Sequence, residues 1–278
     1  MRLLAWDTSS KIGAIAALEW DEKSRGGWDS VRLVSEWTLN LDTSQHSERL
    51  MWGLNQVLES ARWKLEDIDQ FAVGVGPGSF TGLRIGVTTA RTLAHSMKKP
   101  LIALSSLAAL ARPAAQWLRL QSKRTILIAT TDASKGELFA LWGAAKSIVD
   151  CVVVAEGDMP GLWKRGVEEA ALAPAELIKG VKRKLAENNT PSGWAVVGEG
   201  RFRYPDVWKS LPRVKRIDIP SIFSDHIQGR YLGQLAWEAI QAGLRQQALH
   251  VHPRYLRASD AEMKLKAGLL PAGPTRGE

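Results

Sequence analysis

The feature that most constrains the fold is a glycine-rich turn between a strand-like run and a helix-like run. The stretch GPGSFTGLRIG occupies residues 76–86, directly after the apolar run Phe71–Val75 and at the start of a helix expected to extend to about Met97. Such a strand–turn–helix is where many α/β proteins hold a phosphate, because backbone amides are free at a helix N-terminus. The turn therefore favours an α/β fold and raises the question of whether it binds a nucleotide.

The glycine spacing matches neither common phosphate-binding motif. In a Walker A loop a lysine follows the last glycine, but here Leu83 follows Gly82. The dinucleotide motif G-x-G-x-x-G is one residue shorter than the spacing of Gly76, Gly78 and Gly82. A serine or threonine in the turn can instead cap the helix itself. The residues alone favour a structural turn, and a nucleotide-binding turn stays the alternative.

The order of the expected elements predicts two lobes of similar topology. In the first half, three strands precede a helix, a strand, a helix and a strand, at 3–6, 13–20, 31–40, 44–61, 71–75, 82–97 and 101–104. In the second half, three strands precede a helix, a strand and a helix, at 125–131, 137–143, 148–155, 175–186, 194–198 and 227–242. Two tandem βββαβα-like units are typical of the actin-like, Hsp70-like architecture.

This order also suggests where the lobes begin and end. We expect a first lobe over residues 1–104 and a second over 105–257, with the helix at 227–242 able to pack back on the first lobe. Residues 258–278 are expected to form a flexible tail, because AGLLPAGPTRGE is rich in glycine and proline.

The net charge of +8 belongs to the second half of the chain. Residues 1–104 carry 12 Lys and Arg against 12 Asp and Glu, and residues 105–278 carry 25 against 17. A basic lobe suits contact with nucleic acid, although the charge alone favours the simpler interpretation of a solvated surface. The candidate contacts are Lys179, Lys182, Arg183, Lys184, Arg201, Arg203, Arg254 and Arg257.

Several classes of site and location are disfavoured by the residues present. The single cysteine, Cys151, excludes an internal disulfide, and the five histidines lack metal-ligand spacing. There is no G-x-S-x-G nucleophile motif, so we expect neither a catalytic residue nor a metal site. No apolar run reaches the roughly 18–20 residues of a membrane helix. The sequence predicts a cytoplasmic protein with no membrane contact.

A second polar turn, Asp7-Thr8-Ser9, lies between the first two expected strands. It resembles the first phosphate loop of actin-like ATPases, although an aspartate is also ordinary turn chemistry. If a degenerate nucleotide cleft exists, its nearest residues are expected to be Asp7, Ser9, Gly76 and Gly78.

Longer motifs carry a resemblance to a known family. GPGSFTGLRIG, with AWDTSS near the start and TSQHSERL at 43–50, closely resembles the bacterial TsaB (YeaZ) family of tRNA threonylcarbamoyladenosine biosynthesis proteins. The similarity continues through TDASKGELF, VVGEG and HPRYLR, so it covers most of residues 1–257. Ser134 and Phe139 depart from the family pattern, which has Arg and Tyr at these positions.

The resemblance implies an actin-like fold and a non-catalytic role beside a paralogue, TsaD/Kae1. That TsaD-like threonylcarbamoyltransferase modifies the adenosine beside the anticodon in tRNAs that read codons beginning with adenine. It carries a metal-binding HxxxH, whereas residues 46–50 here read HSERL. The implied partners are the TsaD-like paralogue, a TsaE-like ATPase, tRNA through the complex, and a second copy when the protein is isolated.

The resemblance also implies where the partner binds and what the chain needs. The interface would use the helices near 44–61 and 82–97, through His46, Leu50, Met51, Leu54, Leu58, Ile85, Thr89 and Leu93. No cofactor would be required by this chain, although ATP or ADP could bind weakly or at an interface. The main alternative is an actin-like ATPase that acts alone through the Asp7 turn and the glycine turn. A metallopeptidase is the least favoured alternative function.

Overall fold

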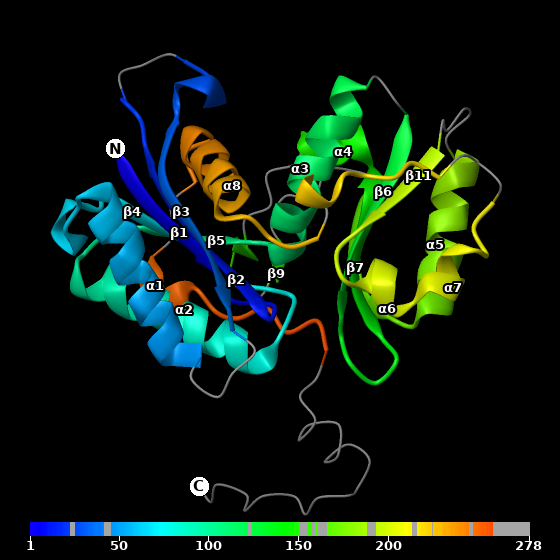
Figure 1. The fold of residues 1–278 in the computed structure, drawn as a ribbon, viewed down its shortest axis with the longest axis horizontal. Coiled ribbons are helices and arrows are strands. Elements are labelled where there is room, and N and C mark those ends of the chain that lie inside the picture. Colours follow the sequence, from blue (N-terminus) through cyan, green and yellow to red (C-terminus); the bar gives the residue numbers. More distant parts are fainter. Residues whose placement is uncertain are drawn as a thin grey trace, which may run out of the picture.

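The computed structural model describes two lobes that lie side by side (Figure 1). The described residues are 1–22, 26–41, 46–121, 124–150, 155–156, 159–160, 166–187, 193–212, 216–223, 225–244 and 247–257. The expected tail at 258–278, the first two residues of the expected helix 44–61, and Cys151 lie outside these ranges.

The first lobe is built on a five-stranded sheet in the order β3-β2-β1-β4-β5. Strands β1, β2 and β3 form an antiparallel meander, and β4 and β5 continue parallel to β1. The strands are β1 (Arg2–Asp7), β2 (Ile12–Glu19), β3 (Arg32–Asn40), β4 (Gln70–Gly74) and β5 (Leu101–Leu104). Short 3-10 turns lie at Trp28–Ser30 (η1) and Leu65–Asp67 (η2).

Helices cover both faces of this sheet. One face is covered by α1 (His46–Ala61) and α2 (Phe80–Ser96), and the opposite face by α8 (Gly229–Gln241) (Figure 1). The last helix approaches β2 closely, because a Cβ on Gly233 would lie 2.3 Å from Leu18 Cδ1. Helix α8, which comes after the second lobe in the sequence, is therefore part of the first lobe's core.

The second lobe repeats this topology on a four-stranded sheet in the order β10-β7-β6-β11. The strands β6, β7 and β10 are antiparallel, and β11 is parallel to β6. A single parallel bridge between Trp194 and Arg216 stands where the first lobe has its fifth strand. The elements are β6 (Thr125–Asp132), β7 (Leu138–Ala144), α4 (Ala145–Val149), β10 (Val167–Leu172), α5 (Pro174–Glu187), β11 (Gly193–Val197), α6 (Gly200–Arg203), α7 (Pro205–Trp208) and η3 (Ser221–Phe223). The strands β8 (Ala155–Glu156) and β9 (Met159–Pro160) pair with each other in a separate sheet, and η4 (Ala248–His250) packs against α2 of the first lobe.

The expected fold class, an actin-like α/β fold of two lobes, is confirmed, but one expected strand is wrong. Residues 148–155 were expected as the third strand of the second lobe, yet Ile148 and Val149 end helix α4 and 151–154 lie outside the described residues. The third strand is β10, whose Val167 pairs with Gly143 of β7. Its two consecutive glutamates, Glu168 and Glu169, hide the strand pattern in the sequence.

Helix α3 (Ser106–Leu120), which the expected elements omit, lies between the two sheets beside α8 (Figure 1). Its first ten residues are all buried, and it contains Pro113, a residue that normally argues against a helix interior. The largest hydrophobic cluster includes residues of both sheets together with α3 and α8. The two lobes therefore share one continuous core.

Candidate functional site

Asp7, the first candidate nucleotide ligand, is enclosed by the chain's own hydroxyl groups. It ends β1 and is 1% exposed. The backbone N and the Oγ of Ser9 donate to Asp7 Oδ1 at 2.8 and 2.6 Å. The Oγ of Ser106, at the first turn of α3, donates to Asp7 Oδ2 at 2.5 Å. Both carboxylate oxygens are thus engaged within the protein.

Burial raises the pKa of Asp7, and the hydrogen bonds from Ser106 and Ser9 act in the opposite direction. Its surroundings leave no room for another atom on the β4 side, because a Cβ on Gly74 would lie 1.7 Å from Asp7 Oδ2. This carboxylate links the end of β1 to the start of α3.

The glycines of the turn are required by the close approach of α2 to the Asp7-Thr8-Ser9 segment. A Cβ on Gly78 would lie 2.2 Å from Ser9 O, and one on Gly82 would lie 2.0 Å from Thr8 O. Thr8 Oγ1 also donates to the carbonyl of Gly82 at 2.7 Å. The two motifs singled out in the sequence therefore pack directly on each other.

Backbone amides of this turn are used inside the protein. The amide of Gly76 donates to Ser106 Oγ at 3.1 Å, and that of Ser79 donates to Ser9 O at 2.7 Å. Ser79 also caps α2, accepting from Gly82 N at 3.3 Å. The structure brings Asp7, Ser9, Gly76 and Gly78 together as expected, but their polar groups bind one another. Ser106 is the member that the sequence analysis missed.

The expected partner face on α1 needs correction. Leu50 and Leu54 are 0% and 2% exposed, and Leu58 is also buried. All three belong to the core between α1 and the sheet. These leucines, spaced four residues apart along α1, therefore face the sheet, as the apolar side of most amphipathic helices does. These three leucines are not surface residues of the isolated chain.

The exposed apolar side chains of α1 are Met51 and Trp52, at 43% and 52%. Trp52 makes an edge contact with Trp37 of β3, with ring centroids 5.2 Å apart. On α2, the three expected residues are half-buried, at Ile85, Thr89 and Leu93. His46 begins α1, but its side chain lies outside what is described. Trp52 is an exposed aromatic residue that was not among the expected partner residues, although it directly follows Met51, which was.

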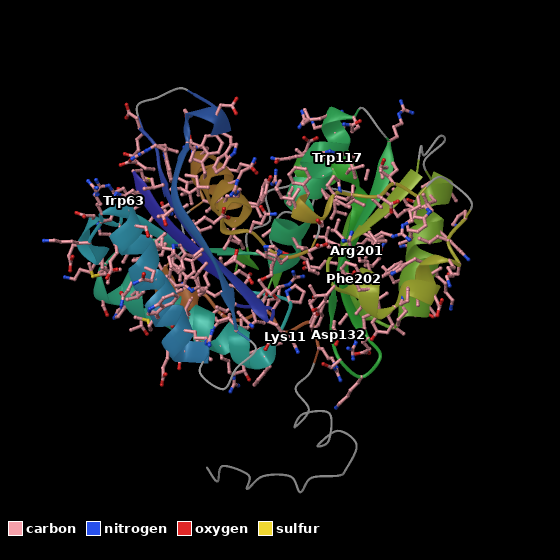
Figure 2. The ribbon with its side chains drawn as sticks, viewed as in Figure 1. Lys11, Trp63, Trp117, Asp132, Arg201 and Phe202 are labelled. Carbon is pink, nitrogen blue, oxygen red and sulfur yellow. The ribbon has the colours of Figure 1, made fainter. Side chains whose placement is uncertain are left out.

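Most of the basic side chains proposed for nucleic acid are paired with acids. Figure 2 shows Arg201, Phe202 and Asp132 on the second lobe. The Arg201 guanidinium lies over the exposed ring of Phe202, 4.4 Å from its centroid, and is paired with Asp225. The other pairs are Lys179–Glu176, Arg183–Glu168, Lys184–Glu168, Arg203–Asp132, Arg254–Glu169 and Arg257–Glu137. These contacts engage most of the candidate cations within the chain, while the lobe keeps its net positive charge, because the paired acids are already counted in it.

Neither a metal-binding cluster nor a membrane-spanning helix is present among the described residues. Within those ranges, no group of three or more His, Cys, Asp or Glu side chains is arranged to hold a metal ion. No helix in the described part of the chain is long and apolar enough to cross a membrane.

Comparison with known proteins relates the chain to a tRNA modification system. The family model for TsaD, tRNA N6-adenosine threonylcarbamoyltransferase, matches residues 40–163. The tRNA threonylcarbamoyladenosine biosynthesis protein TsaB of Escherichia coli is 27% identical over 268 residues, covering 95% of this chain and 98% of that protein. The TsaB protein of Bacillus subtilis is 31% identical over 170 residues, covering 61% of this chain and 67% of that protein.

A solved structure agrees with these relatives. A Pseudomonas aeruginosa protein, described by its similarity to the peptidase YeaZ, superposes with a TM-score of 0.66 at 25% identity. The superposition covers 92% of this chain and 99% of that one, so the likeness extends over both lobes.

Proposed function

Since the chain belongs to the TsaB family of tRNA threonylcarbamoyladenosine biosynthesis proteins, we propose that it is an accessory, non-catalytic subunit in the synthesis of this modified nucleoside. It would act beside a TsaD-like threonylcarbamoyltransferase, on the adenosine next to the anticodon of tRNAs that read codons beginning with adenine. The observation that carries the accessory role is the enclosed Asp7 carboxylate, whose two oxygens bind Ser9 and Ser106.

The same observation supports a chain that requires no nucleotide of its own. The amides of Gly76 and Ser79 donate to atoms of this chain, so they are not offered to a phosphate. An ATP or ADP molecule would then bind weakly, or at a surface completed by a partner. An actin-like ATPase acting alone is the less favoured function, because phosphate binding by the Asp7 turn and the glycine turn would have to break these internal hydrogen bonds.

We assign the TsaD-like partner to the exposed face of α1 and its neighbour α2. Met51 and Trp52 offer apolar surface on α1, and the half-buried Ile85, Thr89 and Leu93 lie on α2. Aromatic residues and methionine are enriched at protein interfaces, which supports this choice. A second copy would use the same face when the protein is isolated. A TsaE-like ATPase and tRNA would join the assembled complex.

The test replaces the two exposed apolar residues of α1. We expect Met51→Glu/Trp52→Glu to stay folded, because neither side chain belongs to the core, and to lose both the complex with the TsaD-like protein and the modification of tRNA. Size-exclusion chromatography measures the complex, and nucleoside analysis of tRNA measures the product. Leu54→Glu cannot serve here, because it would place a charge in the core.

The matched control is Leu120→Glu at the end of α3, where the leucine is 83% exposed. It also places glutamate on an exposed apolar residue, adding one negative charge where the α1 variant adds two, and should leave complex and product unchanged. A folded Met51→Glu/Trp52→Glu variant that binds and supports modification as well as this control would overturn the assignment of the partner face.

A further inference from the structure

The segment at 251–257 follows η4 and passes between the two lobes (Figure 1). It begins on the first lobe, where Val251 is buried in the cluster beneath α1 and α2. The amide of Arg254 then donates to the carbonyl of Val75, just before the glycine turn, at 2.7 Å. The contact is close, because a Cβ on Gly76 would lie 3.0 Å from the carbonyl oxygen of Arg254.

The Arg254 side chain reaches the second lobe. Its Nη1 pairs with the carboxylate of Glu169 on β10, a side chain that is 1% exposed. The other oxygen of Glu169 accepts a hydrogen bond of 2.7 Å from Ser105 Oγ, at the start of α3. A buried carboxylate is costly without charged or hydrogen-bonded partners. Separating Arg254 from Glu169 would therefore be unfavourable.

Two further residues of the segment, Arg257 and Tyr255, contact the second lobe and α2 respectively. Arg257 forms an ion pair of 3.1 Å with Glu137 and donates to the carbonyl of Ala133 in the β6–β7 turn. Tyr255 packs against Phe80 at the start of α2, with ring centroids 4.8 Å apart. Its hydroxyl accepts a hydrogen bond of 3.2 Å from Arg84 Nε. One short segment thus touches both lobes through several independent side chains.

We propose that residues 251–257 form a strap that locks the two lobes in one relative orientation. Two-lobed proteins commonly open and close about a hinge, with a few residues absorbing the movement. In this chain, opening would have to remove Arg254 from Glu169 and Arg257 from the β6–β7 turn at once. The strap rests on the glycine turn and on the first residues of α2, so the lock also fixes that helix against the second lobe. This proposal is independent of the proposed function.

The test measures the distance between the lobes in the full chain. Spin labels are attached at Glu59→Cys on α1 and Lys182→Cys on α5, both exposed positions, in a Cys151→Ser background. Labelled protein is diluted with unlabelled protein, so that pulsed electron resonance reports distances within one molecule. The unaltered strap should give one narrow distance distribution. In Arg254→Ala/Arg257→Ala we expect that single distribution to be lost, through broadening or a second distance.

The matched control is Lys209→Ala/Arg216→Ala, which also removes two cations from the second lobe but outside the strap. It should keep the narrow distribution. If Arg254→Ala/Arg257→Ala does not fold, Tyr255→Ala/Arg257→Ala is measured instead, because it leaves Arg254 in place as the partner of the buried Glu169. A folded strap variant whose distribution is as narrow as that of the control, at the same distance, would show that the strap does not hold the lobes.

Discussion

Asp7 shows how an aspartate in a familiar functional pattern can be bound by hydroxyl groups of its own chain. An aspartate between two strands, near a glycine turn, is what a phosphate-binding cleft of this fold would contain. The deciding contact is made by Ser106, which is 99 positions away in the sequence and donates to Asp7 Oδ2. That hydroxyl is invisible to any local motif, so only the folded chain shows that the carboxylate is already bound.

The raised pKa of Asp7 leads to a prediction of pH-dependent stability. The folded protein binds this proton more tightly than the unfolded chain, whose aspartate keeps its ordinary value of 3.8. Ionisation therefore destabilises the folded state as the pH rises above 3.8, and the full cost is present above the raised pKa. We expect Asp7→Asn to be more stable than the unaltered protein at neutral pH. This advantage should shrink as the pH falls through the raised pKa towards 3.8.

Urea unfolding at a series of pH values measures this difference, and an advantage that grows in acid would contradict it. The same variant bears on the proposed function. Magnesium-dependent ATP turnover by the unaltered chain that disappears in Asp7→Asn would favour an ATPase over an accessory subunit.

At the level of elements, α2 packs closely on the end of β1 and the turn that follows it, and glycines of α2 make this close contact possible. Trp6 Nε1 donates to the carbonyl of Gly86 at 3.1 Å, and a Cβ on Gly86 would lie 2.1 Å from Thr8 Oγ1. Together with Gly78 and Gly82, Gly86 lets α2 lie directly on the turn Asp7-Thr8-Ser9 that follows β1. The glycine-rich motif is thus a packing surface between two segments of one lobe.

We predict that Gly82→Ala destabilises the protein by about 1–3 kcal/mol, the usual cost of forcing an extra methyl group into a packed site. The new Cβ would meet the carbonyl of Thr8, which belongs to the backbone and cannot turn aside as a side chain can. Chemical denaturation measures the change. Gly27→Ala is the control, because no atom lies within 4 Å of its added Cβ and its φ is −74°. Equal stabilities for the two variants would refute the packing argument.

Across the whole molecule, the lobes are joined by a buried polar network between α3 and α8. The guanidinium of Arg112, 1% exposed, binds both oxygens of Glu238 at 2.7 and 3.2 Å and the carbonyl of Val149 at 2.7 Å. Glu238 Oε1 also accepts from Gln234 at 3.1 Å. Burial raises the pKa of Glu238, and Arg112 acts in the opposite direction. This network and the 251–257 strap hold different edges of the same interlobe contact.

Removing one partner of this pair should be more damaging than removing both. We expect Glu238→Ala to lower the free energy of unfolding by about 3–5 kcal/mol, because it takes the carboxylate from a buried guanidinium. The double variant Arg112→Met/Glu238→Leu should recover most of that loss, since apolar side chains of similar size need no charged partner. Urea unfolding of both variants tests this. A double variant that is no more stable than Glu238→Ala would show that the network contributes in another way.

Much of the first lobe was predictable, because its signals are local. Three strands, two helices and the strand Leu101–Leu104 lie within a few residues of the ranges that periodicity and turn residues indicate. The second lobe was harder. Strand β10 carries Glu168 and Glu169, whose charges are offset by Arg183 and Arg254 from distant segments, so nothing nearby in the sequence marks it as a strand. Helix α3 contains Pro113, which argues against a helix when only the neighbouring residues are considered.

By itself, the sequence determined the α/β class, the two-lobe order and the family motifs, because these depend on the spacing of neighbouring residues. Only the tertiary structure decided which side chains are free to act. It placed Leu54 in the core and Met51 at the surface, enclosed Asp7 beneath Ser106, and joined Arg254 to Glu169 across 85 positions. The physical reason is that burial and the pairing of charges depend on contacts between segments far apart in the chain, and local periodicity carries no record of those contacts.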